Sequence, residues 1–518
     1  MDIKISHCKG QCLEKEQPRD MAMDHRTTIA CLTLLSLWSS LALPTLAQNS
    51  TVVTNGFTDP PFQIEIWASN VTGARGLVID DAGDALVVAT GLGGIYAFWE
   101  EPNGQVNSTL IVNNSNLNHG ITIYGNHLYA SSSTTVWRWS YKARQRSTAT
   151  GEETIIVNVS QDEQGDQTAQ DHKTRSLAID TNRILYVSVG STSNVDTDSF
   201  RARIRSFNLT TTIPNGGFNF VGDGVVFADG LRNEVGLGFD GKGQLWGVEN
   251  GADQLNRTDL GGDIHNNNPA EELNLFNGKR GTFYGYPFCW SEYNLPKFGT
   301  GPGSQWAWPT LENGTITDSW CKNVTNVRPP ELAMQAHSAP LGITFYDGTN
   351  CGTLIRNSTT TMNTSYSLPC EYSGDAFVTF HGSWDRDIPV GFKVVRIAFD
   401  NGTGLPIARN DSSIFDVFGA LNSQTACVGA GSATCLRPVD VKFDKSGALL
   451  VTSDATGEII RVTSSNVAGV GAPAPSPAPP SSAPPIGSRV GILLRAFAPT
   501  LVLYVLSWHS EIFHGMMM

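Results

Sequence analysis

A strand–turn–strand pattern recurs six times along this chain, and the repeat restricts the fold more than any other feature. Each copy has an apolar segment, an Asp or Asn in a turn that usually contains Gly, and a second apolar segment. Alternating segments around such turns are typical of antiparallel β-strands. The copies lie at residues 76–90, 120–131, 176–190, 236–250, 342–348 with 374–382, and 441–454.

The spacing of the copies predicts a closed architecture. About 70 residues per copy is enough for a four-stranded sheet and its loops, and radial closure of six such sheets protects their edges. We therefore expect an all-β fold, a six-bladed β-propeller over residues 48–464. An insertion near residues 265–335 is expected to lengthen the fifth unit and to line or cover a site.

Composition excludes several other classes of protein. The 518 residues include 52 Gly and 26 Pro, whereas long helices and coiled coils are rich in Ala, Glu, Lys, Leu and Arg. A hydrophobic content of 40% excludes disorder over most of the chain. The net charge of -13 argues against nucleic acid as a partner, because phosphate binding needs clustered Lys and Arg.

The N-terminal residues 1–47 are typical of a signal peptide. An apolar run at 28–43 precedes small residues ending at Ala47, as in a secretory leader and its cleavage site. Translation from Met21 or Met23 is an alternative to a start at Met1. Asn-x-Ser/Thr sequons recur from Asn49 to Asn410, so we expect a secreted, extracellular glycoprotein.

Six cysteines follow the leader, and an even number in an oxidising compartment predicts three disulfides. Their spacing does not match that of zinc ligands. Pairing of sequence neighbours is the simplest of the fifteen possible arrangements. It would join Cys289 with Cys321, Cys351 with Cys370, and Cys427 with Cys435.

The C-terminal part of the chain changes character at about residue 465. Residues 465–489 form a Pro/Ala/Ser-rich segment that is expected to be an extended stalk. Residues 490–518 contain a hydrophobic tail. A small-residue region, a spacer and such a tail are typical of a GPI-anchor signal, which predicts membrane attachment at the cell surface. A membrane span and an error in the gene model are alternatives, because the last residues, 508–518, are atypical of an anchor signal.

The polar residues at the start of the repeated strand pairs form a pattern of their own. In a propeller these positions converge on the central channel, and here each of them carries Arg or His. Several such side chains around one channel in an acidic protein predict a local anion site, for a ligand with several carboxylates or phosphates. The residues are Arg75, His119, His172 with Arg175, Arg232, His337 and Arg437.

Five segments resemble a known family, the soluble glucose/sorbosone dehydrogenases, and most closely its secreted fungal branch, the pyranose dehydrogenases of auxiliary activity family 12. These are six-bladed propellers that use pyrroloquinoline quinone (PQQ). PQQ is a tricarboxylate, so it fits the anion site inferred independently above. The resemblance covers about residues 55 to 463, and its segments are 172–191, 230–256, 337–346, 374–386 and 437–462.

The resemblance implies an activity and roles for individual residues. The family oxidises the anomeric carbon of an aldose or related pyranose to a lactone and passes electrons to a haem protein, a copper monooxygenase or a quinone. His172 matches the general base that takes the C1 hydroxyl proton as hydride passes to the quinone C5. Arg232 matches the residue that stabilises negative charge on the quinone oxygens.

The resemblance also implies a cofactor shell. Gly251 and Ala252 would offer backbone carbonyls to a Ca²⁺ that clamps PQQ, with Glu249 nearby. The bacterial members have Pro where this chain has Ala252, and they use a Lys where this chain offers His381 and Arg386. The remaining expected cofactor contacts are Arg75, Asn233, Asn250, His381, Trp384 over the ring face, Arg386 and Arg437.

Two other functions remain open at this point. A calcium-dependent propeller lactonase or hydrolase would need a cage of carboxylate and Asn side chains at the channel centre, and the Arg/His set disfavours it. A non-catalytic cell-surface binding propeller is compatible with the fold, because propellers have many functions. The absence of cofactor binding would support this last reading.

Overall fold

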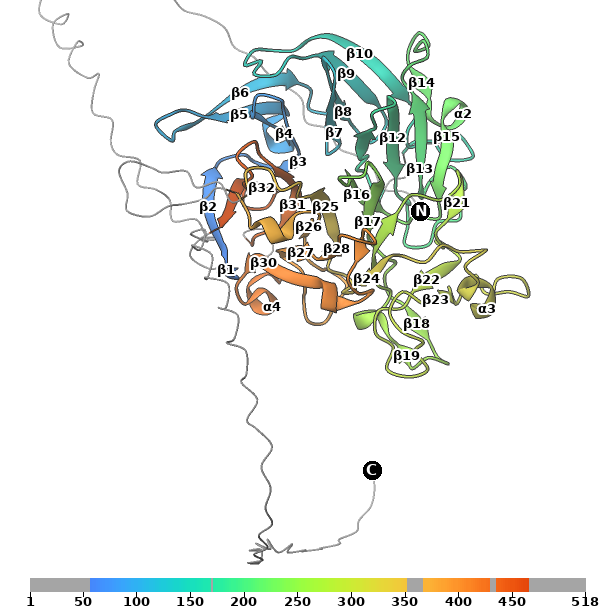
Figure 1. Ribbon diagram of the computed structural model, residues 1–518. Helices are drawn as coiled ribbons and strands as arrows, with labels where there is room; N and C mark the ends of the chain where they lie inside the picture. The colour runs from blue at the N-terminus through green and yellow to red at the C-terminus, as the bar shows by residue number, and fades with distance from the viewer. Residues whose placement is uncertain (1–55, 169–170, 352–366, 429–434, 465–518) are drawn as a thin grey trace, which may run out of the picture. The chain divides into compact units, whose positions relative to one another are not determined.

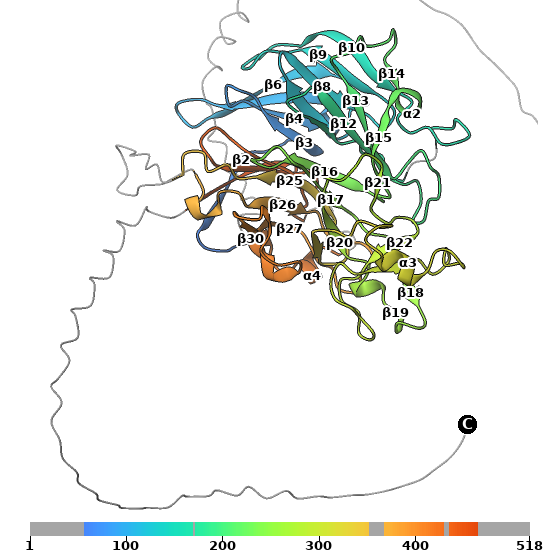
Figure 2. The same ribbon diagram turned by 45° about the vertical axis from the view of Figure 1, so that its right-hand side comes forward.

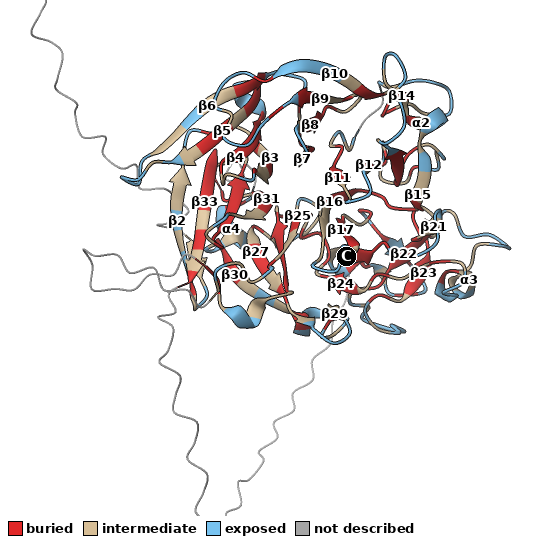
Figure 3. Ribbon diagram, turned by 45° about the horizontal axis from the view of Figure 1, so that its top comes forward, coloured by how far each residue is buried: buried red, intermediate tan, exposed pale blue. Residues whose placement is uncertain are grey.

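Six β-sheets surround a central axis in the computed structural model, which describes residues 56–168, 171–351, 367–428 and 435–464 (Figures 1 and 3). Each sheet is one blade, so the expected six-bladed β-propeller is confirmed. The predicted leader, stalk and hydrophobic tail lie outside the described residues. Among the described helices, none is long and apolar enough to cross a membrane.

The first three blades follow one another along the chain. Blade 1 consists of β3 (Ala74–Ile79), β4 (Ala85–Ala89), β5 (Gly94–Glu100) and β6 (Val106–Asn113). Blade 2 consists of β7 (Ile121–Tyr124), β8 (His127–Ser131), β9 (Val136–Ser140) and β10 (Thr150–Val157), with β14 (Phe218–Asn219) at its edge. Blade 3 consists of β11 (Leu177–Ile179), β12 (Ile184–Val189), β13 (Arg203–Asn208) and β15 (Val225–Asp229), with β21 (Thr282–Phe283) at its edge.

The other three blades complete the ring. Blade 4 consists of β16 (Glu234–Phe239), β17 (Leu245–Glu249), β20 (Glu271–Leu275) and β24 (Leu332–Met334). Blade 5 consists of β25 (Pro340–Phe345), β26 (Ala376–Phe380), β27 (Lys393–Ile397) and β30 (Ile414–Ala420), with β1 (Gly56–Thr58) at its edge. Blade 6 consists of β31 (Pro438–Phe443), β32 (Leu449–Ser453), β33 (Glu458–Ser464) and β2 (Phe62–Ala68).

The repeated sequence segments form the two innermost strands of every blade. A shared turn explains why the pattern is so regular. In blade 1 the Asp80 Oδ1 accepts hydrogen bonds from the backbone N–H groups of Ala82 and Asp84, and Gly83 adopts φ 94°. Such Asx turns are local structures that the side chain stabilises. The same arrangement recurs at Asp180, Asp240 and Asp444.

The expectation that the insertion near 265–335 belongs to the fifth unit is wrong. Its residues include β20 and β24, which are the third and fourth strands of blade 4. Between them lie β22 (Cys289–Ser291), β23 (Gln305–Ala307) and α3 (Asp318–Lys322), grouped outside the ring beside β21 (Figures 1 and 2). Sequence order alone did not reveal that a long insertion separates two hydrogen-bonded strands of one sheet.

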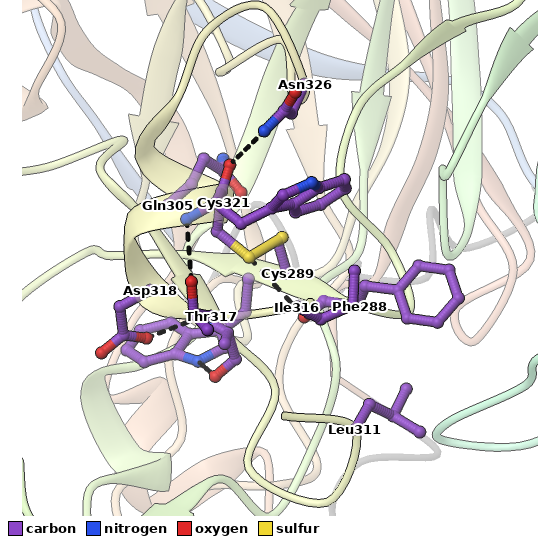
Figure 4. The surroundings of a disulfide bond; sticks show 12 residues. Phe288, Cys289, Gln305, Leu311, Ile316, Thr317, Asp318, Cys321 and Asn326 are labelled. Atoms are coloured by element: carbon purple, nitrogen blue, oxygen red, sulfur yellow. Dashed lines mark hydrogen bonds between the residues drawn. A yellow bond between two sulfur atoms is a disulfide. The ribbon is translucent and has the colours of Figure 1, made fainter. Parts of the chain in front are cut away.

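The three expected disulfides are confirmed. Cys289 bonds to Cys321, Cys351 to Cys370, and Cys427 to Cys435. The first of them joins β22 to α3 inside the insertion, where the Cys321 Sγ lies 3.8 Å from the carbonyl oxygen of Phe288 (Figure 4). This cross-link holds the insertion together next to blade 4.

The ring is closed by its N-terminal strand. β2 pairs antiparallel with β33, so that Ile66 lies opposite Ile460, and the Ile460 side chain is fully buried. A blade that combines both ends of the chain prevents the ring from opening.

We expect Ile460→Ala to lower the free energy of unfolding by about 2–5 kcal/mol, because it leaves a cavity in this closing sheet. Urea denaturation measures the effect. Val225→Ala is the matched control, since Val225 is 44% exposed and surface changes are worth about 0.5 kcal/mol or less. Equal stability of the two variants would contradict the proposed role of this sheet.

Candidate functional site

A cavity of about 390 Å³ opens where the inner strands of blades 3 to 6 begin. Its volume lies in the range of small-molecule sites. Seven residues that the sequence predicted to be catalytic or cofactor-binding line it, together with Gly251, a predicted metal ligand. The seven are His172, Arg232, Asn233, Asn250, His381, Trp384 and Arg437. Trp384 is 72% exposed.

His172 is held in one tautomer by its neighbours. Its Nδ1 lies 2.9 Å from the carbonyl oxygen of Ser191. A carbonyl can only accept, so Nδ1 carries the proton and Nε2 keeps its lone pair. Burial, with a further contribution from the Arg232 guanidinium, lowers the pKa of His172 to about 4. The imidazole is therefore neutral near pH 7, as a general base must be.

Close packing surrounds the base of the His172 side chain. A Cβ added at Gly190, the last residue before the blade 3 loop, would lie 2.7 Å from the His172 Cβ and 2.8 Å from the Asn233 Oδ1. Only glycine fits there without displacing one of the two side chains.

Arg232 is anchored by four hydrogen bonds from its guanidinium. Nη2 donates to the Asp253 Oδ2 at 2.6 Å and to the Asn194 Oδ1 at 3.1 Å. Nη1 donates to the Gly251 carbonyl at 2.5 Å, and Nε donates to the Asn194 carbonyl at 3.3 Å. A guanidinium has five N–H groups, so one Nη1 hydrogen remains for a ligand.

His381 and Arg437 form a second fixed unit. Arg437 Nη2 donates to the His381 Nδ1 at 2.9 Å, which leaves the proton of the neutral ring on Nε2. That Nε2 donates to the Asp454 Oδ1 at 3.0 Å, and Asp454 also binds the Arg75 Nη1 at 2.7 Å. Both ring nitrogens of His381 are thus used inside the protein. His381 would therefore act on a ligand only indirectly, by orienting Arg437.

Several residues proposed from the sequence do not line this cavity. Arg75 is paired with Asp454, and neither residue lines the cavity. Arg386 donates to backbone carbonyls of Asn266 and Ile388. Of the four arginines expected to face one channel, Arg232 and Arg437 line the cavity and Arg75 and Arg175 do not. The guanidinium of Arg175 is buried among backbone carbonyls and the Ser160 hydroxyl.

Of the three expected metal ligands, Gly251 lines this cavity and Glu249 and Ala252 do not. All three line a smaller space that shares Arg232 and Gly251 with the cavity. Side chains alternate along a strand and its continuation, so Asn250 faces the cavity and Glu249 faces the interior of blade 4. His119 lies in a separate space of the channel, where burial lowers its pKa to about 3.

Two acidic residues of the cavity were not singled out from the sequence. Asp253, which pairs with Arg232, has a lowered pKa despite its burial, because His337 and Arg232 bind it. Glu271 accepts hydrogen bonds from the backbone N–H groups of Gly251 and Ala339, and burial raises its pKa to about 7. Glu271 is the first residue of β20, and this position at the start of a strand was the sequence signal that could have indicated it. The signal was missed because β20 lies in the insertion that was expected to belong to the fifth unit.

The sequence pattern of one family, described as TrAA12-like, matches residues 57–465. The chain belongs to the TrAA12-like family. Two relatives illustrate the similarity. A PQQ-dependent sugar dehydrogenase of Hypocrea jecorina is 32% identical over 462 residues, covering 82% of this chain and 95% of the relative. A PQQ-dependent pyranose dehydrogenase of Coprinopsis cinerea is 31% identical over 431 residues, covering 79% of this chain.

The TrAA12-like chain spans about half the length of the Coprinopsis relative, since the match covers 54% of that protein. Solved structures agree with the family assignment. The holo form of the PQQ domain of Coprinopsis cinerea pyranose dehydrogenase aligns with a TM-score of 0.66 and 29% identity, covering 79% of this chain and 97% of that one. A calcium structure of the Trichoderma reesei family AA12 enzyme aligns with a TM-score of 0.66 and 28% identity, with the same coverage.

Proposed function

We propose that this TrAA12-like chain is a PQQ-dependent sugar dehydrogenase that oxidises the anomeric C–OH of an aldose or related pyranose to a lactone. The observation that carries the proposal is one cavity that unites a neutral, unprotonated His172 Nε2 with two anchored arginines. The names of the relatives support the same chemistry.

The residues of the cavity fit PQQ. Among the described residues, Arg437 Nη1 has no hydrogen-bond partner, so it is available for a carboxylate of the cofactor. Asn250 uses one amide hydrogen on the Pro340 carbonyl at 2.7 Å and keeps the other. One Nη1 hydrogen of Arg232 also remains. These donors suit a flat, polyanionic quinone better than a neutral ligand.

When bound, PQQ accepts the two electrons that leave the sugar. The chain supplies the proton chemistry and the electrostatics. His172 Nε2 removes the proton of the anomeric hydroxyl, and the Nδ1–H bond to Ser191 stabilises the imidazolium that forms. Arg232 stabilises negative charge in the cavity, and Asp253 and Asn194 hold its guanidinium still, which avoids reorganisation during the reaction.

Calcium belongs to the same proposal. Gly251 is the one of the three expected ligands that lines the cavity. Its carbonyl accepts one hydrogen bond from Arg232, and a carbonyl oxygen has a second lone pair for a hard cation. Glu249 and the expected carbonyl donor Ala252 are not among the residues that line the cavity, so Gly251 is the expected ligand that we retain for the cofactor's cation site.

The lactonase alternative has one observation in its favour. Asp253, His337 and Asp385 each place one ligand atom within 4.8 Å of the others, an arrangement that could hold a metal. Asp253, however, is already paired with Arg232 at 2.6 Å. Lactone hydrolysis by the PQQ-free chain with added metal would support the alternative, and sugar-dependent dye reduction by the PQQ-loaded chain would support the dehydrogenase.

We expect Arg437→Gln to raise the Kd for PQQ at least about tenfold, because a charge-assisted hydrogen bond is worth about 1.5–3 kcal/mol. Titration of PQQ into the full chain with Ca²⁺ present, followed by fluorescence, measures the change. Arg138→Gln is the matched control, since Arg138 pairs with Glu153 at the surface of blade 2. Equal affinity of the two variants would contradict the assignment of Arg437.

The cellular setting is also proposed. A secreted, glycosylated protein that transfers electrons to a haem protein, a copper monooxygenase or a quinone is consistent with the leader-like N-terminus and the three disulfides. Attachment to the membrane through the C-terminus remains a prediction from the sequence of residues 490–518. Disulfides are typical of oxidising compartments.

A further inference from the structure

A groove on the insertion of blade 4 is separate from the cavity described above. It has a volume of about 600 Å³ and lies between the hairpin loop 292–304, which joins β22 to β23, and the segment that precedes β30. The cavity proposed for the cofactor and the sugar is smaller, about 390 Å³. The groove therefore has room for a ligand of several linked units. Its lining residues are 292–299, 301, 302 and 410–412.

A buried carboxylate holds the hairpin loop in shape. The Glu292 side chain accepts hydrogen bonds from the backbone N–H groups of Thr300 and Gly301, at 2.9 and 3.1 Å. It also accepts from the Trp306 indole at 3.0 Å, and Glu292 is only 3% exposed. A loop fastened from inside in this way presents its outward side chains in one arrangement, which lowers the entropy cost of binding a ligand.

The same loop is fastened to its neighbours at its start. The Oδ1 of Asn268, a fully buried residue, accepts from the backbone N–H groups of Tyr293 and Asn294, at 2.9 and 3.2 Å. The Tyr293 hydroxyl donates to the Asp411 Oδ2 at 2.6 Å. This last bond joins the two walls of the groove, so the width of the groove is set before a ligand arrives.

Phe298 presents an aromatic ring to solvent from this loop. It lines the groove and is 72% exposed. Its φ of 60° lies in the left-handed region, which is unusual for a bulky side chain. Such conformations persist only where the surrounding structure imposes them, and they are concentrated at binding sites. A fixed, exposed ring can stack against a ligand with an apolar face, because C–H groups are attracted to the negative face of the ring.

Polar groups around Phe298 are available for hydrogen bonds. Within the described part of the chain, the side chains of Asn294, Lys297 and Ser412 form no hydrogen bond or salt bridge. The Asp411 Oδ1 is also without a partner there, since Tyr293 binds the other oxygen. Together these groups supply both donors and acceptors. One ammonium group and one exposed carboxylate leave no excess of either charge among them, which favours a neutral ligand.

This combination suits a carbohydrate. A pyranose ring has an apolar C–H face and a rim of neutral hydroxyl groups that both donate and accept hydrogen bonds. The groove is also connected to the proposed active site. Asn267 accepts from the Asn294 N–H through its carbonyl and from the Arg386 Nη1 through its Oδ1, both at 3.3 Å. Arg386 follows Trp384, which lines the cavity, by two residues.

We propose that the groove is an accessory site for a neutral oligosaccharide, in which Phe298 stacks on one pyranose ring and Asn294 and Asp411 bind hydroxyl groups. The choice of a sugar as occupant rests on the proposed function, because both sites then bind the same class of molecule. The groove shares no lining residue with the cofactor cavity. It would keep the protein attached to a sugar chain beside that cavity.

The competing occupant is a sugar chain of the protein itself. Asn410 lines the groove and begins an Asn-x-Ser sequon, so an N-linked glycan attached there would be placed to cover Phe298. We favour an external chain because the aromatic ring and the unpaired groups of Asn294 and Lys297 all belong to the hairpin loop. That loop is the wall connected to the cavity through Asn267.

The test is isothermal titration calorimetry of the full chain, made without PQQ in a host that attaches N-linked glycans. The probes are cellohexaose, xylohexaose and maltohexaose, each reduced at its free end to an alditol, which has no anomeric C–OH to oxidise. We expect at least one probe to bind the wild type, and Phe298→Ala to raise its Kd at least about fivefold through loss of the stacking contact. Asn294→Ala should also raise the Kd, since it removes a free amide.

Val324→Ala is the matched control, because Val324 is 71% exposed in the same insertion and does not line the groove. It should keep the wild-type Kd. If Phe298→Ala also keeps the wild-type Kd, or if both variants lose affinity equally, the proposal is wrong.

Asn410→Gln distinguishes the two sources of sugar. Binding by this variant and not by the wild type would show that the protein's own glycan fills the groove, which overturns the proposal. Absence of binding by both would overturn it in favour of another occupant, such as a protein partner. Because PQQ is absent throughout, failure of the dehydrogenase proposal would be seen in dye reduction and would not change these binding results.

Discussion

Replacing His172 with Gln is expected to lower kcat for sugar-dependent dye reduction by about 10²–10⁴, the usual contribution of a positioned general base. Gln is similar in length and its amide can still donate to the Ser191 carbonyl that now accepts from Nδ1 at 2.9 Å. What it lacks is a basic nitrogen. Steady-state kinetics of the PQQ-loaded chain, with calcium present, measures the loss.

Two controls accompany this variant. PQQ affinity should stay within about threefold of the wild type, because the arginines that suit the cofactor are unchanged. The pH profile gives an independent readout, because a base with a pKa of about 4 is protonated as the pH falls through that value. Burial also lowers the pKa of His381 to about 4, and His381 is present in both proteins, so the wild-type rate should fall more steeply there than the residual rate of the variant. Glu271, with its pKa of about 7, titrates above this window. A variant with near wild-type kcat would contradict the assignment of His172.

Arg232→Gln is expected to have the second largest effect, a loss of about 10²–10³ in kcat, as for other residues that stabilise developing negative charge. The guanidinium is held by Asp253, Asn194 and the Gly251 carbonyl, so its position is set before substrate binds. Arg232→Lys should recover only part of the rate, because an ammonium group cannot make these four bonds at once.

Removing Arg232 also leaves the buried Asp253 carboxylate without its arginine partner, with His337 as its remaining side-chain partner, which lowers stability. Tm is therefore measured beside kcat. Arg203→Gln is the matched control, since it breaks a comparable ion pair with Asp229 on blade 3 at 3.0 Å. If both variants lose similar stability and similar kcat, the effect of Arg232 is structural and its proposed role in the reaction is wrong.

The sequence predicted the parts of the protein that local interactions determine. The Asp turns depend on hydrogen bonds between a side chain and N–H groups two and four residues further on, as at Asp80. Such turns mark the strand pairs of four of the six repeats. Sequence neighbours among the cysteines paired as expected. The start of each inner strand is fixed by the repeat, which explains why His172, Arg232 and Arg437 were expected together.

Only the tertiary structure decided which of these polar groups remain available. Arg175 and Arg75 occupy the expected position in the repeat, but carbonyls and a carboxylate from distant segments satisfy their guanidinium groups. Three buried glutamates, Glu234, Glu249 and Glu272, lie side by side because of the register of strands β16, β17 and β20, and β20 lies after a long loop. The sequence determines which side chains each strand places on its two faces. Which strands lie side by side, and hence which charges must share one buried space, depends on long-range pairing that no local pattern encodes.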